Sequence, residues 1–135
     1  MIFTKRLTYV NKIRKKSDSP IFNQIIELIP RHLLRKSISK NQSDKHCSVY
    51  FAYDRLVSTM FGQLNRCLSL REICLGIDRS PEFLSDIGLM QSPAKSSMSA
   101  GNTKRNYKVF EDLYHDLLSH YKHELSRRPE YKMID

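Results

Sequence analysis

Cysteine is scarce in this sequence, and long apolar runs are missing. The three cysteines, Cys47, Cys67 and Cys74, form no CxxC pair, and their odd number argues against a disulfide framework. We expect free thiols, with Cys67 and Cys74 as small core residues. The first apolar residues are followed directly by Lys5 and Arg6, so no stretch is long enough for a signal peptide or a membrane span. These absences favour a cytoplasmic protein.

Motifs for catalysis and metal binding are also missing. The sequence contains no GxSxG, no HExxH and no glycine-rich phosphate loop. His115, His120 and His123 fall on one predicted helix, but their spacings of five and three residues do not place all three on one face. No cysteine or carboxylate cluster completes a tetrahedral site around the neighbouring pair His120 and His123. We therefore expect no metal and no cofactor in this chain.

Acidic residues are few in the first third of the chain. Residues 1–46 carry 11 basic and 3 acidic side chains, residues 47–90 carry 4 and 5, and residues 91–135 carry 8 and 6. The net charge of +9 is thus concentrated at the front. Such asymmetry indicates a polyanionic partner, either nucleic acid or an anionic membrane surface. The alternative is a solvated basic tail that only keeps the protein in solution.

Helix signals recur along the chain, and no alternating run of Val and Ile indicates a strand. Ser69 and Glu72 form a capping box, in which each side chain bonds the backbone amide of the other residue. Ser80 is a helix cap followed by Pro81 at the first helical position. We expect an all-α fold, a small multi-helix bundle with a helix-turn-helix-like part and a basic N-terminal arm. The expected helices cover residues 21–29, 31–40, 51–65, 69–77, 80–88, 97–105 and 107–127.

The apolar spacing also predicts the core. In the helix over 51–65, Leu56, Met60 and Leu64 recur at helical spacing, with Val57 and Phe61 beside them. Gly62 in that helix costs about 1 kcal/mol relative to Ala, which favours close packing of another helix there. In the last helix, the predicted buried stripe consists of Phe110, Leu113, Leu117, Leu118, Tyr121 and Leu125.

The helix over 97–105 has the composition of a helix that enters a DNA groove. It is small, polar and basic, and Asn102 and Arg105 lie three residues apart, so they are expected to share one face. Asn can bind adenine through two hydrogen bonds, and Arg can do so with guanine or bind a phosphate. As an alternative, Asn102 only caps the turn before the Tyr107 helix. The predicted DNA-binding residues are Arg71, Lys95, Ser97, Asn102, Lys104 and Arg105, with Lys12, Arg14, Lys15 and Lys16 of the arm.

Six segments follow one another in the order and spacing of a known domain. They are Ile21-Phe22-Asn23-Gln24-Ile25, Ile29-Pro30-Arg31-His32, Met60-Phe61-Gly62-Gln63-Leu64, Ser69-Leu70-Arg71-Glu72-Ile73-Cys74, Leu84-Ser85-Asp86-Ile87-Gly88-Leu89 and Ser96-Ser97-Met98-Ser99-Ala100-Gly101-Asn102. From about Pro20 onwards, the chain resembles the amino-terminal domain of bacterial insertion-sequence transposases of the DDE type, in the insertion sequence four superfamily. In that family, the domain precedes a catalytic core of ribonuclease-H-like fold, in which three carboxylates hold two divalent metal ions.

The resemblance implies a function in DNA transposition and divides the chain into three parts. Residues 1–18 are a basic arm, residues 19–128 are a helical DNA-binding domain, and residues 129–135 are similar to the first strand of the core. Asp135 matches the first metal-binding carboxylate. One carboxylate cannot hold two metal ions about 4 Å apart. We therefore expect a truncated transposase that is not an enzyme by itself, with magnesium needed only by the full-length enzyme.

The same resemblance implies roles and partners. Arg71 and Lys95 would hold phosphates, while the helix from Ser97 would enter the major groove at the terminal repeats of the element. The chain departs from the family at Ala100, where a larger residue is usual, and at Gly101, where Ala is usual. Double-stranded DNA in the bacterial nucleoid is the expected partner, and a membrane is not. The alternatives are self-association, with another copy or with intact transposase, and a non-catalytic regulator that binds DNA or RNA.

Overall fold

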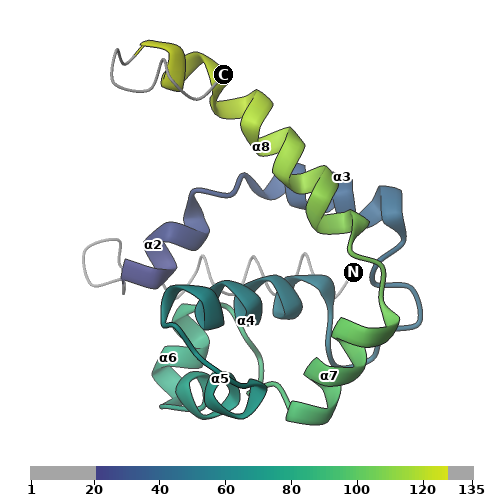
Figure 1. Cartoon of the computed structure of the whole chain (residues 1–135), viewed down its shortest axis with the longest axis vertical. Helices are drawn as coiled ribbons and strands as arrows, with labels where there is room; N and C mark the ends of the chain where they lie inside the picture. The colour runs from purple at the N-terminus through teal and green to yellow at the C-terminus, as the bar shows by residue number, and fades with distance from the viewer. Residues whose placement is uncertain (1–20, 128–135) are drawn as a thin grey trace.

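The computed structural model describes residues 21–127. Within these residues, all of the regular secondary structure is helical, and the helices are joined by turns and loops. One helix, α4, lies between two groups, with α2, α3 and α8 on one side and α5, α6 and α7 on the other (Figure 1). This arrangement confirms the all-α prediction. The predicted arm over 1–18 and the predicted strand over 129–135 lie outside the described residues. The helices are α2 (Ile21–Glu27), α3 (Arg31–Asn41), α4 (Ala52–Leu64), α5 (Leu70–Ile77), α6 (Pro81–Asp86), α7 (Lys95–Lys104) and α8 (Lys108–Arg127).

Local side-chain caps set the ends of α5 and α6. The Ser69 hydroxyl accepts from the Glu72 N–H at 3.2 Å, and the Ser80 hydroxyl accepts from the Phe83 N–H at 3.1 Å. The predicted capping box is only half formed, because the Glu72 carboxylate accepts from the Leu68 N–H rather than from that of Ser69. Helix α6 ends at Asp86 with Ile87 as its C-cap, and the next residue, Gly88, has a φ of 78°, a left-handed conformation that glycine adopts without a steric cost.

The core is formed around α4, but not by the stripe that the sequence predicted. Val57 and Phe61 are buried as expected, whereas Leu56 and Met60 are half-buried and Leu64 is 53 % exposed. The reason is that α4 has neighbours on two sides, so two of its faces are covered, whereas its last two residues, Gln63 and Leu64, are exposed. The faces that are covered bury, in addition, Ala52, Tyr53, Asp54, Arg55, Ser58 and Gly62.

Helices α4 and α5 approach closely through one glycine on each. A Cβ added to Gly62 would lie 2.5 Å from Ile73 Cδ1, and a Cβ added to Gly76 would lie 2.6 Å from Phe61 Cε1. Close packing at Gly62 is therefore confirmed. The ring of Phe61 is held in turn by edge contacts with Phe22 and Phe83, at centroid distances of 5.5 and 6.0 Å.

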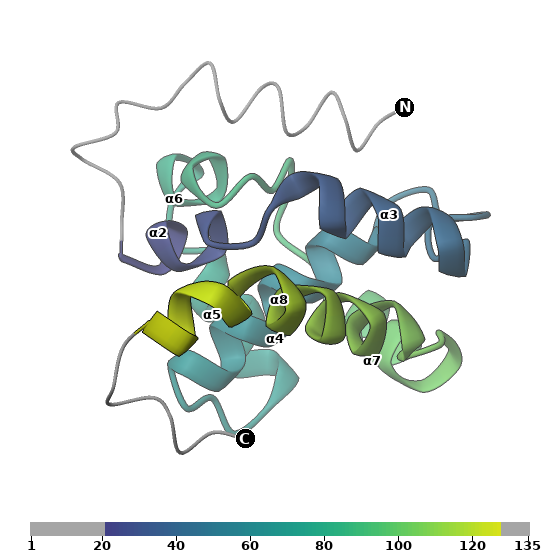
Figure 2. The same cartoon turned by 90° about the horizontal axis from the view of Figure 1, so that it is seen from above.

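Helices α3 and α8 lie side by side in the other layer (Figure 2). The buried Ser37 hydroxyl donates to the Val109 carbonyl at 2.5 Å, and Asn41 donates to the Asp112 carboxylate at 2.9 Å. On the outside, Lys36 pairs with Asp116 at 3.5 Å. Polar contacts thus fix α8 along α3.

The predicted buried stripe of α8 is wrong for its second half. Leu113 is buried together with Val109, which the prediction did not include, and Leu118 and Leu125 are 45 % and 37 % exposed. Residues 122–127 are all exposed, because the end of α8 projects from the bundle (Figure 1). The bundle therefore covers only some of the apolar side chains of α8 and leaves others, such as Leu118 and Leu125, exposed.

Candidate nucleic-acid interface

Helix α7 is attached to the bundle through a narrow inner face. Met98 and Gly101, three residues apart, are its buried residues. A Cβ at Gly101 would lie 3.0 Å from Cε1 of the buried Tyr50 ring, so glycine allows this ring to lie against the helix backbone. Gly101, which departs from the family pattern, therefore has a packing role here, although it lowers the helix propensity.

The outer face of α7 is small, polar and cationic. Asn102 and Lys104 are exposed, as is Lys95 in the first turn. No carboxylate occurs between residues 95 and 104. The sequence analysis missed three exposed hydroxyl residues at the spacing of the same face. They are Ser96, Ser99 and Thr103, and the helical spacing back from Asn102 and Lys95 was the signal that could have found them.

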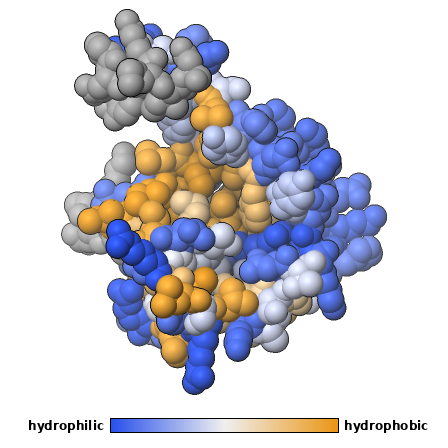
Figure 3. Space-filling view, viewed as in Figure 1, coloured by the Kyte–Doolittle hydropathy of each residue, from blue (hydrophilic) through white to orange (hydrophobic). Residues whose placement is uncertain are grey.

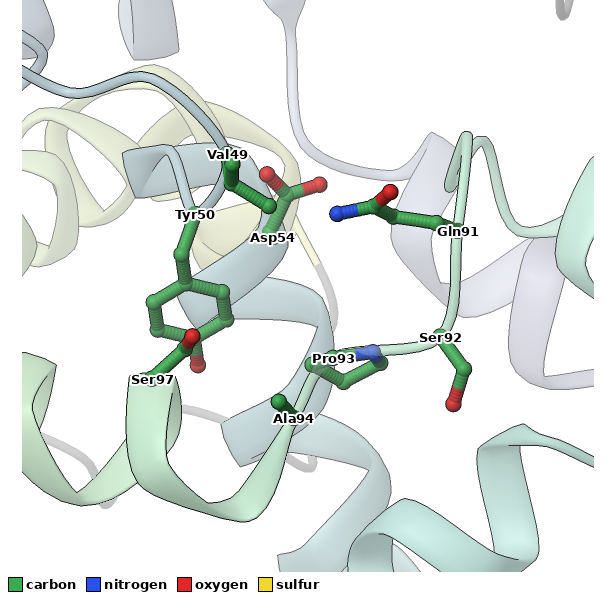
Figure 4. Close-up of a pocket in the computed structure, with 8 residues that line it drawn as sticks. All are labelled: Val49, Tyr50, Asp54, Gln91, Ser92, Pro93, Ala94 and Ser97. Atoms are coloured by element: carbon green, nitrogen blue, oxygen red, sulfur yellow. The ribbon is translucent and has the colours of Figure 1, made fainter.

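Ser97 belongs to the inner side of α7 instead. It is half-buried and lines a small pocket of about 50 Å³ together with Tyr50 and Asp54 (Figure 4). The pocket wall opposite is formed by the loop before the helix, from Gln91 to Ala94. Ser97 therefore does not lie with Asn102 on the exposed face, contrary to the orientation that its predicted DNA contact needs.

Arg105 also turns inward. Helix α7 ends at Lys104, and Arg105 follows in an extended conformation with φ −94° and ψ 146°. Its guanidinium donates to the Tyr50 carbonyl and lies 5.4 Å from the centroid of the Tyr50 ring. The predicted shared face of Asn102 and Arg105 is therefore wrong, because the helical spacing ends one residue too early.

Asn102 does not cap the following helix. The side-chain oxygen of Asn106 accepts from the Lys108 N–H at 2.9 Å, at the start of α8. The alternative prediction, that Asn102 caps this turn, is therefore wrong, because Asn106 caps it. The Asn102 side chain lies exposed on α7.

The buried side chain of Arg55 contacts the residues that join α7 to α8. The side chain is 7 % exposed, donates to the Asn106 carbonyl at 3.2 Å and lies 4.9 Å from the centroid of the Phe110 ring. Desolvation lowers the pKa of Arg55, and the nearby Tyr50 opposes this shift. Burial likewise raises the pKa of the Tyr50 hydroxyl. The two aromatic rings and the two arginines that contact them hold the ends of α7 and α8 together.

Arg71 lies on α5 and Lys95 on α7, and these two helices contact each other. Arg71 is exposed one turn before Cys74, and the Cys74 thiol lies 3.4 Å from the Met98 sulfur on α7. Burial raises the pKa of Cys74, and the positive charge of Lys95 opposes this shift. The two predicted phosphate ligands therefore belong to adjoining helices.

The cations of α3 have a different environment from those of α7. Two of them are paired with acidic side chains of α8, Lys36 with Asp116 and Lys40 with Asp112. The predicted arm cations, Lys12, Arg14, Lys15 and Lys16, lie outside the described residues, as does Asp135. Part of the excess charge of the first third is thus compensated within the bundle, whereas α7 carries no acidic residue.

Between residues 21 and 127, no group of three His, Cys, Asp or Glu side chains is arranged to hold a metal ion. None of the helices in this part of the chain combines the length and the apolar character needed to cross a membrane. Residues 17–90 match the model of a family described as Domain of unknown function (DUF4372). No curated protein and no solved structure matches the chain.

Proposed function

The chain belongs to the family described as Domain of unknown function (DUF4372), and we propose that this member binds double-stranded DNA through α7. One observation carries the proposal. The outer face of α7 consists of small polar side chains between Lys95 and Lys104, with no carboxylate, on a helix whose inner face is fixed to the bundle. A helix of this kind fits the major groove, where short polar side chains can approach base edges.

The first turn of α7 and its later residues are expected to contact different parts of the DNA. Its N-cap is Ala94, which makes no side-chain capping bond, so the amides of the first turn are available to a phosphate oxygen. Lys95 lies in the same turn and Arg71 on the adjoining helix. We expect these two cations to bind the DNA backbone. Asn102, two turns further on, is the side chain that we expect to reach a base.

The resemblance to transposase amino-terminal domains gives this proposal its biological context. In that context the DNA would be the terminal repeat of an insertion element, and the domain would act in transposition by binding rather than by catalysis. The basic arm would add sequence-independent attraction.

The first test measures phosphate contacts by fluorescence anisotropy of a labelled duplex over a range of salt concentrations. The affinity falls with salt, so the slope of log affinity against log salt is negative. If Lys95 binds a phosphate, Lys95→Gln makes this slope shallower by about 0.9. Lys122→Gln is the matched control, since Lys122 is an exposed lysine on the projecting end of α8. Equal effects of the two changes would assign the binding to overall charge and would contradict the α7 interface.

The second test measures base recognition. Asn102→Ala is expected to weaken binding to a terminal-repeat duplex by about 1 to 3 kcal/mol and to leave random duplex unchanged. Duplex RNA of the same sequence is a control, because its major groove is too narrow for side-chain readout. An unchanged ratio of specific to random binding would contradict the role of Asn102. A protein that binds no duplex DNA at low salt would contradict the whole proposal.

A further inference from the structure

Two arginines, Arg55 of α4 and Arg105 directly after α7, meet around Tyr50. The Arg105 guanidinium donates to the Tyr50 carbonyl and lies against the Tyr50 ring. A Cβ at Gly101 would lie 3.0 Å from Tyr50 Cε1 and 3.9 Å from Arg55 Cδ, so both side chains approach the same point of α7. The Arg55 guanidinium then reaches the carbonyl of Asn106, the residue that follows Arg105. Two positive charges thus lie where α7 ends.

Neither of these arginines has a partner of opposite charge. Within residues 21–127, no carboxylate forms an ion pair with Arg55 or with Arg105. Asp44 and Asp54, the carboxylates near the start of α4, accept from backbone amides there, at 2.7 and 2.8 Å. The hydrogen bonds of the two guanidinium groups go to backbone carbonyls instead.

The positive charge of Arg55 is costly to bury without a counter-ion. The side chain is 7 % exposed, and in the described part of the chain its Nε–H is buried without a hydrogen-bond partner. Desolvation is the main cause that lowers the pKa of Arg55, and the positive charge of Arg105 lowers it further. The carbonyls at the end of α7 supply only about half a negative charge. Since buried charges in proteins are normally paired, a negative group from outside the chain would compensate this one.

The surface beside the arginine pair is cationic and open to solvent. Arg105 is half-buried, and both Lys104 and Lys108 are exposed. No acidic residue occurs between residues 87 and 110. Hydrophilic side chains predominate on the side of the molecule where α7 joins α8 (Figure 3). An anion can therefore approach Arg105 from solvent without meeting a negative charge of this segment.

We infer that Arg105, backed by the buried charge of Arg55, binds one phosphate group. A guanidinium group suits this ligand, because its planar fork can donate two parallel hydrogen bonds to phosphate oxygens. Arg105 contacts the oxygens, while Arg55 adds a second positive charge behind it and fixes the connection to α8 through Asn106. The exposed lysines Lys104 and Lys108 add attraction at longer range.

Two sources can supply a phosphate group to this site. One is the backbone of double-stranded DNA, and this source rests on the function proposed for α7. Lys95 begins that helix and Arg105 follows it, so the two cations lie about 15 Å apart along its axis. The major groove is about 12 Å wide, so a helix in the groove can contact phosphates at both of its ends. The other source is a free phosphate group in solution.

The first test follows the Nε–H signals of the arginines by NMR, while inorganic phosphate is added to the whole chain at constant ionic strength. The signals of Arg55 and Arg105 are expected to shift together and to saturate. The matched control is Arg79, an exposed arginine that also lies over an aromatic ring, 4.8 Å from the centroid of Phe83. Its signal should not saturate. Equal shifts of all three signals would show unspecific attraction and would overturn the inference.

A substitution then tests whether Arg105 is the ligand. Arg105→Gln should weaken the affinity for inorganic phosphate at least about tenfold, the size expected for a lost hydrogen bond to a charged group, whereas Arg79→Gln should leave it unchanged. Circular dichroism shows whether the helices are retained. If Arg105→Gln unfolds the chain, Arg105→Lys takes its place, because lysine keeps the charge but loses the fork, and it should also weaken binding. Full affinity in the folded variant would overturn the inference.

Duplex DNA distinguishes the two sources. If the site holds a backbone phosphate, Arg105→Gln makes the slope of log affinity against log salt shallower by about 0.9, and Arg79→Gln does not. An unchanged slope, with the arginine signals still responding to inorganic phosphate, would assign the site to a free phosphate group.

The inference and the function proposed for α7 can fail separately. A chain that binds inorganic phosphate at Arg105 but binds no duplex DNA would contradict the proposed function and support the inference. A chain that binds DNA through Lys95, while neither phosphate nor DNA moves the signals of Arg55 and Arg105, would overturn the inference alone.

Discussion

Replacement of Gly76 by Ala puts the contact between α4 and α5 to a quantitative test. The added Cβ would lie 2.6 Å from Cε1 and 2.8 Å from Cζ of Phe61. Ordinary contact begins near 3.4 Å, so the ring would have to move by about 0.8 Å. Phe61 is 3 % exposed and has edge contacts with Phe22 and Phe83, so it has little room to move.

Two opposing terms decide the result. Alanine in a helix gains about 0.8 to 1 kcal/mol over glycine. Overpacking of a buried contact costs about 1 to 3 kcal/mol, and the fixed position of Phe61 favours the upper part of that range. We therefore expect Gly76→Ala to lower the free energy of unfolding by about 1 to 2 kcal/mol. In a chain of this length, each kcal/mol corresponds to about 4 °C in the melting temperature.

Urea denaturation followed by circular dichroism measures this change, and a double-mutant cycle identifies its cause. Phe61→Leu removes the ring edge that the new Cβ would meet, so Gly76→Ala should cost at least 1 kcal/mol less in that background, about the size of coupling expected for residues in contact. If Gly76→Ala stabilises the protein by the full helix-propensity gain, the close approach of the two helices is wrong. Equal costs in both backgrounds would refute the assignment of the strain to Phe61.

Three further changes probe the outer layer and the arm. Ser37→Ala should cost about 0.5 to 1.5 kcal/mol in urea denaturation, because it removes a buried hydrogen bond to a carbonyl of α8, whereas Ser126→Ala at an exposed position should change stability by less than about 0.5 kcal/mol. The hydrogen bond from Asn41 lowers the pKa of Asp112 below its ordinary value of 3.8. The ionised Asp112 carboxylate thus stabilises the fold at pH values above 3.8, and this stabilisation is lost as the pH falls through the lower pKa of the folded state. Asp112→Asn should therefore make the free energy of unfolding depend less on pH below about pH 4. Deletion of residues 1–16 should flatten the salt dependence of DNA binding, and an unchanged slope would exclude the arm from the interface.

The ends of the helices could be predicted because the signals that set them are local. Ser69 and Ser80 act on amides three residues away, and Gly88 directly follows the C-cap of α6 in a left-handed conformation. Such signals need no information about the rest of the fold. The all-α class and the close packing at Gly62 could be predicted for the same reason.

The orientation of side chains was harder to predict, because it depends on which neighbours a helix finds. Leu64 and Leu118 have the apolar spacing of core residues, but no residue between 21 and 127 covers them fully. Arg105 has the charge and position of a DNA ligand, yet it bonds Tyr50, which lies 55 residues away in the sequence. Spacing identifies faces of a helix, and only the arrangement of the other helices decides which face is free.

The contact between α3 and α8 has a consequence for the order in which the chain folds. The bond from Ser37 to Val109 spans 72 residues, and it can form only after that long segment has closed. Helices α4 to α7 follow one another in sequence between these two partners, so their mutual contacts close shorter loops. We therefore expect α4 to α7 to assemble first and α8 to dock last. In hydrogen exchange, the amides of α8 would open at a lower free energy than those of α4, so α8 would also be the first helix to leave the bundle.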